Sequence, residues 1–294
     1  MKKSKVKRTL NINSVKHLSY HLGFPPSEIL QVASGAENLY NFKEAPKKSG
    51  GVREISIPRK RLKRIQTSIH TLLAKIAMPD CAHGGIKGRS NLTNAQPHCN
   101  KRFLLNLDLK NFYPSISHYM VYALFHKTLK CSSEVSSILT KLTTVKGQVP
   151  QGGSMSTDIA NLVLRELDKR IGKLSTLYGI TYTRYVDDIS LSGNFIPDIF
   201  IRKIKQIVLQ TGFQLKTEKE ALRGPSEPKY VTGLSVNRKK PNVPRLTRRE
   251  VRKEAYLFNR FPEKNLEDFL FTKKYQQIKG KLAYIDYIKQ NGGH

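Results

Sequence analysis

Two adjacent aspartates, Asp187 and Asp188, stand where the sequence predicts the tip of a β-hairpin. They separate two β-rich runs, residues 179–184 and 189–193, whose composition is typical of paired strands. Two like charges at a turn repel each other, and a purely structural hairpin is better served there by Asn-Gly or Asp-Gly. A divalent cation would remove the repulsion, although aspartate is also a common residue of solvated turns. The pair therefore needs support from other residues.

A third carboxylate, Asp108, ends the apolar run at residues 103–107. An aspartate at the end of a strand that is buried on both sides is costly unless it binds something. If this strand lies beside the acidic hairpin in one sheet, the three aspartates meet. Such a cluster suits two hard cations, and Mg²⁺ is the expected metal because it prefers oxygen ligands and shares them with substrate phosphates. The predicted chemistry is an in-line phosphoryl displacement.

The charge balance predicts a polyanionic partner. Lysine and arginine number 52 against 22 acidic residues, a formal net charge of +30 on 294 residues. With 38% hydrophobic residues the chain can bury a core, so nucleic acid is favoured over a disordered basic tail, with a basic but unliganded surface as the alternative. The three cysteines suggest neither a disulfide framework nor a zinc site, and no apolar run is long enough to span a membrane. A cytoplasmic protein without a membrane partner is expected.

Other segments must position these groups. Residues 41–58 predict a hairpin whose glycine tip carries basic side chains suited to phosphate, and residues 59–77 predict a helix. The glycine-containing loop 148–156 leads into one long helix that ends at Gly179, and free N–H groups at its start favour an anion. A short β segment is predicted at residues 229–237.

The C-terminal part, residues 247–290, is predicted to be helical and basic. Its expected core stripe consists of Leu266, Phe269, Leu270, Ile278, Leu282, Ile285 and Ile288.

The order and separation of these motifs over residues 40–240 resemble those of the reverse transcriptases. The motifs are Asp108 followed by Phe112-Tyr113, then Val149-Pro150-Gln151-Gly152, then Tyr185-Val186-Asp187-Asp188. The resemblance implies an α+β right-hand polymerase fold, with fingers, a palm of antiparallel sheet plus helices, and a helical thumb. It implies N-terminal helices and fingers at 1–107 with 130–155 contributing, an interrupted palm at 108–230, and a palm–thumb junction and basic thumb at 231–294.

The same resemblance implies roles for individual residues. Asp108, Asp187 and Asp188 match the catalytic carboxylates that hold two Mg²⁺ ions, with the backbone carbonyl of Leu109 as a further ligand. Tyr113 matches the aromatic gate that collides with a ribose 2′-hydroxyl and so favours dNTPs. The other expected dNTP contacts are Gln151, the phosphate-binding Lys47 and Arg53, and Lys219, which resembles the lysine proposed to protonate pyrophosphate. Lys216 departs from the pattern, since related intron enzymes usually have Asn there.

Two short stretches narrow the family. Residues 94–98 resemble the NAxxH signature, and residues 231–233 the VTG signature, of bacterial retron reverse transcriptases. Such enzymes copy part of a structured noncoding RNA, primed from a guanosine 2′-hydroxyl, into branched RNA-linked single-stranded DNA, and work in anti-phage defence with an accessory effector protein. RNA contacts are then expected from Asn94, His98, Val231, Thr232, Gly233, Arg238, Lys239, Lys240, Arg248 and Arg249.

Three alternatives remain open. A polymerase that makes RNA could share the three carboxylates, but Tyr113 argues against it. Another bacterial reverse transcriptase, similar to the group II intron enzymes, would share most of the motifs. A non-catalytic RNA-binding module would explain the charge alone, but it gains nothing from carboxylates concentrated near a polyanion.

Overall fold

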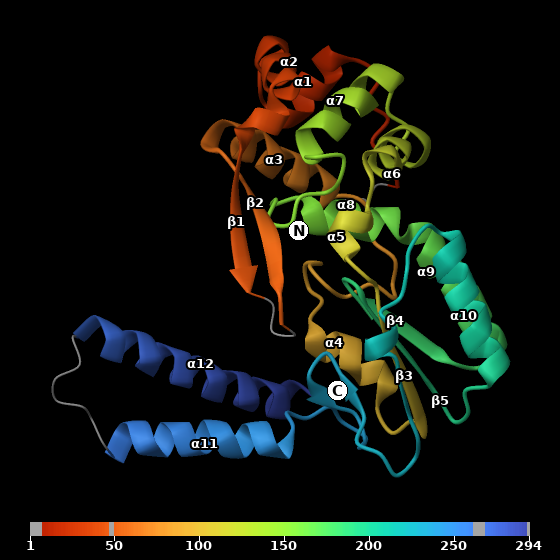
Figure 1. The fold of residues 1–294 in the computed structure, drawn as a ribbon, viewed down its shortest axis with the longest axis vertical. Helices are drawn as coiled ribbons and strands as arrows, with labels where there is room; N and C mark the ends of the chain where they lie inside the picture. The colour runs from red at the N-terminus through yellow and green to blue at the C-terminus, as the bar shows by residue number, and fades with distance from the viewer. Residues whose placement is uncertain (1–7, 47–49, 261–267, 293–294) are drawn as a thin grey trace, which may run out of the picture.

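A four-stranded antiparallel sheet in the order β4-β5-β3-β6 lies in the lower right part of the molecule in Figure 1. The computed structural model describes residues 8–46, 50–260 and 268–292. The strands are β3 (Phe103–Asp108), β4 (Thr181–Tyr185), β5 (Asp188–Gly193) and β6 (Ala221–Arg223). The predicted acidic hairpin is therefore confirmed as β4–β5, and β3 pairs directly with β5.

Strand alternation gives the sheet two different faces. Leu105 and Leu107 of β3 belong to the large core, which also contains residues of the helices α8 (Ser156–Val163), α9 (Arg165–Leu177) and α10 (Asp198–Gln210). Asp108 and Asn106 alternate with these leucines and therefore lie on the other face. The single long helix predicted after residue 156 was wrong, because a turn at Leu164 divides it into α8 and α9.

The N-terminal lobe continues the large core. It contains α1 (Val15–Leu22), α2 (Pro26–Ser34), α3 (Lys60–Leu73) and α7 (Ser133–Thr143), the last of which was not predicted. The predicted glycine-tipped hairpin is present as β1 (Tyr40–Pro46) and β2 (Val52–Pro58). Helix α3 ends four residues before the predicted boundary at residue 77. Short elements complete this part: η1 (Ala36–Leu39), α5 (Phe112–Ser115), α6 (His118–Ala123), and η3 (Leu124–Thr128), which is a single π-helical turn.

A smaller core covers the second face of the sheet. It joins Leu104 of β3 to α4 (Asn91–Ala95), to a hairpin of β7 (Tyr230–Val231) and β8 (Leu234–Ser235), and to Ile288. One β segment was predicted here, whereas the structure has two strands, because positive φ angles of 45° at Thr232 and 81° at Gly233 reverse the chain. The turns η2 (Gln96–His98) and η4 (Thr217–Lys219) lie next to the sheet.

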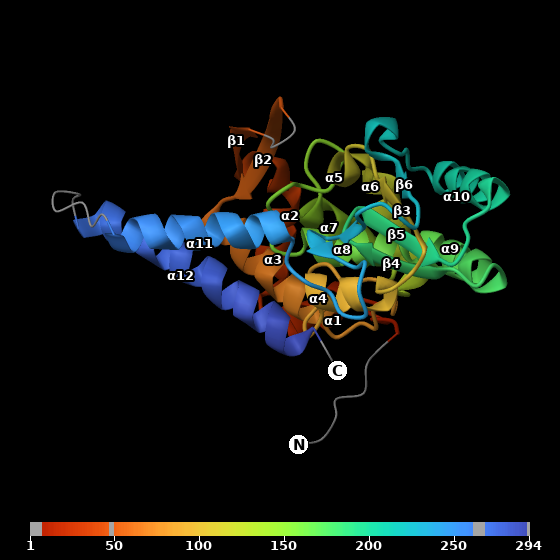
Figure 2. The same cartoon turned by 90° about the horizontal axis from the view of Figure 1, so that it is seen from below.

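Two helices, α11 (Arg245–Arg260) and α12 (Asp268–Asn291), form an antiparallel extension on the side of the molecule opposite α9 and α10 (Figures 1 and 2). Of its predicted core stripe, Ile278 and Ile288 are buried, whereas Leu282 and Ile285 are only half-buried. The side chains of Leu266, Phe269 and Leu270 lie outside the described residues. Among the helices that the structure describes, none is both long and apolar enough to cross a membrane.

Candidate active site

Asp108 and Asp188 are cross-strand partners at the end of the sheet. They lie opposite each other in the β3–β5 register, so their side chains lie on the same face, which the smaller core covers. A cavity of about 200 Å³ opens between them and the β7–β8 turn. Its lining consists of Asn106, Leu107, Asp108, Asp188, Ile189, Ser190, Lys219, Thr232 and Gly233. The predicted meeting of the β3 carboxylate with the acidic hairpin is thus what the structure shows.

Two lysines are ion-paired with Asp108. Lys216 Nζ lies 2.6 Å from Oδ1 and Lys219 Nζ lies 2.6 Å from Oδ2, and the Asp108 side chain is 6% exposed. Burial alone would raise the pKa of Asp108, but these two ammonium groups hold it below its ordinary value. The backbone N–H of Lys216 also donates to the Asp108 carbonyl at 2.9 Å. Lys216, which departs from the family pattern, is therefore a second positively charged partner of Asp108 beside Lys219.

Asp187 follows a residue with an unusual backbone. Val186 has φ of +58°, the left-handed region, where a β-branched residue is strained by about 1–3 kcal/mol. The Asp187 carbonyl accepts a hydrogen bond from the Leu109 N–H at 3.2 Å, which ties the tip to the residue after β3. Burial and the Asp108 charge raise the pKa of Asp187. Partial removal from water and the charges of Asp187 and Asp108 raise the pKa of Asp188 to about 7.

The donor set fits divalent cations, although the carboxylates are not arranged around one. Within the described residues, no three His, Cys, Asp or Glu side chains are grouped ready to hold an ion. Both oxygens of Asp108 are instead ion-paired with lysines. Carboxylate oxygens are the ligands that hard divalent ions prefer. Burial first, and the neighbouring carboxylates second, raise the pKa values of Asp187 and Asp188, and a bound cation would lower them.

The other predicted nucleotide contacts lie on α5, on the loop before α8 and on the β1–β2 hairpin. The Tyr113 hydroxyl hydrogen-bonds the Thr157 hydroxyl at 3.0 Å, which fixes the ring at the start of α8. The Gln151 carbonyl accepts from the Ser56 N–H of β2 at 3.0 Å, so the loop before α8 packs on the hairpin. Arg53 is exposed on β2. Lys47 lies outside the described residues.

The residues predicted to bind RNA divide by exposure. Asn94, His98 and Val231 are buried at 0%, 1% and 0% exposure, so none of them presents a surface for direct contact with RNA. Thr232 and Gly233 instead line the cavity that holds Asp108 and Asp188. The basic residues divide in the same way: Arg238, Lys239, Lys240 and Arg249 are exposed, and Arg248 is half-buried.

His98 is a buried neutral histidine, and its burial predicts a pH effect. Its ring nitrogens hydrogen-bond Ser192 Oγ and Thr183 Oγ1, each at 2.7 Å, and burial lowers its pKa to about 3. Since the unfolded chain takes up this proton first as the pH falls below about 6.5, stability is lost on acidification, by about 2 kcal/mol between pH 7 and pH 5. We expect His98→Gln to remove this part of the pH dependence of the unfolding free energy, as measured by urea unfolding at pH 7 and pH 5. An unchanged pH dependence would contradict this.

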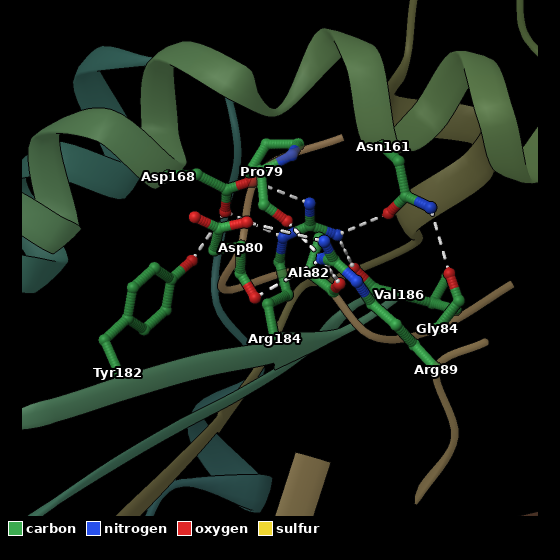
Figure 3. A network of polar contacts seen from close by, with 10 residues as sticks. All are labelled: Pro79, Asp80, Ala82, Gly84, Arg89, Asn161, Asp168, Tyr182, Arg184 and Val186. Atoms are coloured by element: carbon green, nitrogen blue, oxygen red, sulfur yellow. Dashed lines mark hydrogen bonds and ion pairs between the residues drawn. The ribbon is translucent and has the colours of Figure 1, made fainter. Parts of the chain in front are cut away.

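A buried polar network beneath the hairpin was not predicted (Figure 3). Arg184 of β4 is fully buried and forms a two-pronged ion pair with Asp168 of α9, which also accepts from the Tyr182 hydroxyl. Two signals were present in the sequence. Asp168 falls on the helical stripe of Leu164 and Ile171, and an arginine stands directly before the acidic turn.

The sheet with its acidic edge, together with a match to a family model, defines the class of protein to which this chain belongs. Residues 45–234 match the family described as "Reverse transcriptase (RNA-dependent DNA polymerase)". The fold is similar to that of telomerase from Candida albicans, solved in complex with a fragment of telomeric RNA. The TM-score is 0.53 and the identity 11%, over 87% of this chain and 61% of that one. At this identity the likeness shows the right-hand polymerase fold.

Curated relatives narrow the class. The chain is 32% identical to the retron Ec86 reverse transcriptase of Escherichia coli over 246 residues, 83% of this chain and 73% of that protein. It is 34% identical to the retron Se72 enzyme of Salmonella heidelberg, over 84% and 67% of the two chains. With the retron Mx65 enzyme of Myxococcus xanthus it shares 35% identity, over 65% of this chain and half of that one. The chain belongs to the retron-type reverse transcriptases, and it is an RNA-directed DNA polymerase.

Proposed function

We propose that this polymerase copies part of a structured noncoding RNA encoded beside it into branched, RNA-linked single-stranded DNA. Synthesis begins at the 2′-hydroxyl of a guanosine in that RNA. The product and an accessory effector protein act together in the cytoplasm, as part of an anti-phage defence system. The similarity to retron enzymes supports the assignment of a noncoding RNA as template. One observation in the structure supports the assignment of the polymerase reaction to this site. That observation is the cavity where Asp108 and Asp188 face the Thr232-Gly233 turn.

The reaction is nucleotidyl transfer from a dNTP. Two Mg²⁺ ions held by Asp108, Asp187 and Asp188, with the Leu109 carbonyl as a further ligand, would stabilise the attacking and the leaving oxygen. Lys219 Nζ lies 2.6 Å from an Asp108 oxygen, and this proximity supports a role for its ammonium group in giving a proton to pyrophosphate. Gln151, Lys47 and Arg53 then orient the nucleotide and its phosphates.

The domain division follows from the same assignment. Residues 1–107, with 130–155, form N-terminal helices and fingers, 108–230 the interrupted palm, and 231–294 the junction and basic thumb. The exposed basic residues Arg238, Lys239, Lys240 and Arg249 contact the RNA backbone, and Arg248 lies beside them. The buried Asn94 and His98 act indirectly, by fixing α4 and η2 against the sheet and the β7–β8 hairpin.

The gene expressed with its flanking DNA tests this function. We expect RNA-linked single-stranded DNA that shortens after RNase and debranching treatment, and none from a variant with Asp187→Ala and Asp188→Ala. DNA that is linear and unbranched would indicate another bacterial reverse transcriptase of the group II intron type. No DNA on any primed template would leave only an RNA-binding module.

Tyr113 is expected to select the sugar. The hydrogen bond to Thr157 fixes the ring, so a ribose 2′-hydroxyl would collide with a ring that cannot move aside. Tyr113→Ala should raise kcat/KM for rNTPs relative to dNTPs by about 10- to 100-fold, since the discrimination rests on excluding one hydroxyl. Tyr113→Phe keeps the ring but loses this hydrogen bond, so it should keep most of the discrimination and lose only the part that depends on the fixed ring position. The same dNTP preference in the Ala variant and the wild type would remove this role.

Binding of RNA should depend steeply on salt. Each phosphate neutralised by lysine or arginine releases condensed counterions, so the logarithm of affinity falls linearly with the logarithm of salt concentration. Changing Arg238, Lys239 and Lys240 together to Gln should reduce that slope by about 2. The matched control changes three exposed lysines of α9 and α10, Lys169, Lys173 and Lys203, and should leave the slope unchanged. A flat response in the wild type would indicate a solvated basic surface.

A further inference from the structure

Val186, the strained residue of the acidic tip, is held by two separate contacts. Its carbonyl accepts a hydrogen bond from Nη1 of Arg184 at 2.7 Å (Figure 3). Its other neighbour is Gly84. A β-carbon built on Gly84 would come within 2.4 Å of Val186 Cγ2 and 2.6 Å of its backbone nitrogen, so only glycine fits against the tip. The conformation that precedes Asp187 is therefore fixed by one contact from within the hairpin, Arg184, and by one from outside it, Gly84.

The two contacts are joined in a closed ring. Nη1 of Arg184 also donates to Asn161 Oδ1 at 2.9 Å, and Asn161 Nδ2 donates to the Gly84 carbonyl at 2.9 Å (Figure 3). The remaining nitrogens of the guanidinium, Nε and Nη2, bond the two Asp168 oxygens at 2.9 and 2.8 Å. Because the arginine side chain is fully buried and makes a forked ion pair, its position is defined to within a narrow range.

The loop that carries Gly84 is fixed as well. Nη1 of Arg89 donates to the Pro79 and Ala82 carbonyls. The loop also pairs with β4 through the backbone: the Arg184 N–H donates to the Cys81 carbonyl at 2.7 Å, and the His83 N–H donates to the Arg184 carbonyl at 2.8 Å. Gly84 is thus a rigid neighbour of the tip.

Arg184 acts on the carboxylates only through the backbone. In the register of β4 and β5, Arg184 pairs with Ile189 of the large core, whereas Asp188 points to the face that carries Asp108. The guanidinium therefore lies on the opposite face of the sheet from the cavity. Arg184 is connected to the acidic tip through its hydrogen bond to the carbonyl of Val186, the residue before Asp187.

We propose that Arg184, Asn161 and Gly84 form a positioning assembly that sets the placement of Asp187 and Asp188 relative to Asp108. The assembly holds the left-handed turn at Val186 against its strain, so the backbone that carries Asp187 and Asp188 is fixed before ions and nucleotide arrive. This inference rests on the proposed role of the three aspartates as cation ligands. Residues that orient metal ligands in this way commonly change metal affinity or activity by about 10- to 100-fold when altered.

The test perturbs the tip by two independent routes. Gly84→Ala leaves the Arg184–Asp168 pair intact but forces Val186 to move, and φ at Gly84 is not positive, so alanine strains only the contact. Arg184→Lys keeps the charge and loses the fork. Tyr182→Phe is the matched control, because it removes a bond to Asp168 in the same network without touching Val186.

Two readouts are taken well below each variant's unfolding midpoint. Mn²⁺ affinity is measured by water proton relaxation, and kcat and the KM for dNTP by primer extension. For Gly84→Ala and Arg184→Lys we expect Mn²⁺ affinity to fall about tenfold and kcat about 20- to 100-fold, with KM and RNA affinity within about threefold. Tyr182→Phe should stay within about twofold on every measure.

Wild-type Mn²⁺ affinity and kcat in Gly84→Ala would overturn the proposal, and so would an equal loss in Tyr182→Phe. If Arg184→Lys does not fold, Gly84→Ala decides alone. Failure of the proposed cation site is recognised separately: the variant with Asp187→Ala and Asp188→Ala would then bind Mn²⁺ and extend primers like the wild type.

Discussion

Replacing Asp187 and Asp188 together by alanine is expected to abolish primer extension, with a fall in kcat of at least about a thousandfold. Asp188 lies opposite Asp108 in the cavity, and Asp187 precedes it at the tip of the hairpin. Among the described residues, Asp108 and Asp188 are the acidic side chains that line the cavity. The measurement is single-turnover extension of a primed RNA template with dNTPs in excess. RNA affinity should be equal or slightly higher, because two negative charges are removed from the neighbourhood of a polyanion.

A matched control separates this effect from the change in net charge. Glu166 and Asp198 are exposed acidic residues of α9 and α10, away from the cavity, and changing both to alanine removes the same charge. That variant should extend primers at the wild-type rate. If the control loses as much activity as the tip variant, or if the tip variant keeps extending primers, the carboxylates do not hold the catalytic ions.

The largest effect on stability is expected from Asp168→Ala. It leaves the fully buried Arg184 guanidinium without its two carboxylate bonds, and an unpaired buried charge costs about 3–5 kcal/mol. Against a total stability of about 5–15 kcal/mol, such a loss would unfold a marginal protein at 37 °C. Urea unfolding at 25 °C measures it.

Tyr182→Phe gives the comparison for this stability effect. It removes one hydrogen bond to the same carboxylate, the bond from the tyrosine hydroxyl at 2.7 Å, and should cost about 1.5–3 kcal/mol. The ion pair stays satisfied in that variant. A loss for Asp168→Ala no larger than for Tyr182→Phe would show that water or another acceptor replaces the missing carboxylate.

The strands and the carboxylates that they carry could be predicted from local pattern. The apolar run before Asp108 and the β-rich runs around Asp187 each contain their own signal, because strand period and charge are visible in one segment. The motif order then implied that the two elements meet, and the β3–β5 register shows that they do. The fold of the palm was predictable to that extent.

What the sequence did not reveal depends on contacts between distant segments. The helix after residue 156 has continuous apolar periodicity, yet a turn at Leu164 redirects it, and nothing in the local composition marks that turn. Lys216 reads as a surface lysine until the chain brings it 2.6 Å from Asp108, 108 residues away. Asn94 and His98 were expected at an RNA surface, but the small core and the sheet bury them.

The burial of the C-terminal apolar stripe also depends on contacts that the sequence does not show. A helical apolar pattern predicts a face that packs, but not the amount of protein available to pack against it. Because α11 and α12 mainly contact each other, residues such as Leu282 and Ile285 are covered only in part.

Both ends of the extension formed by α11 and α12 are attached to the smaller core. It leaves the molecule just after β8, and α12 returns to the same small core, where Ile288 is buried and the Asn91 side chain bonds the Tyr284 hydroxyl. The ion pair between Lys281 and Glu254 couples its two arms. The base of the extension adjoins the Thr232-Gly233 turn, since the Asn91 side chain also donates to the Thr232 carbonyl. A load on the extension would therefore reach Thr232 and Gly233, in the wall of the cavity, through the small core.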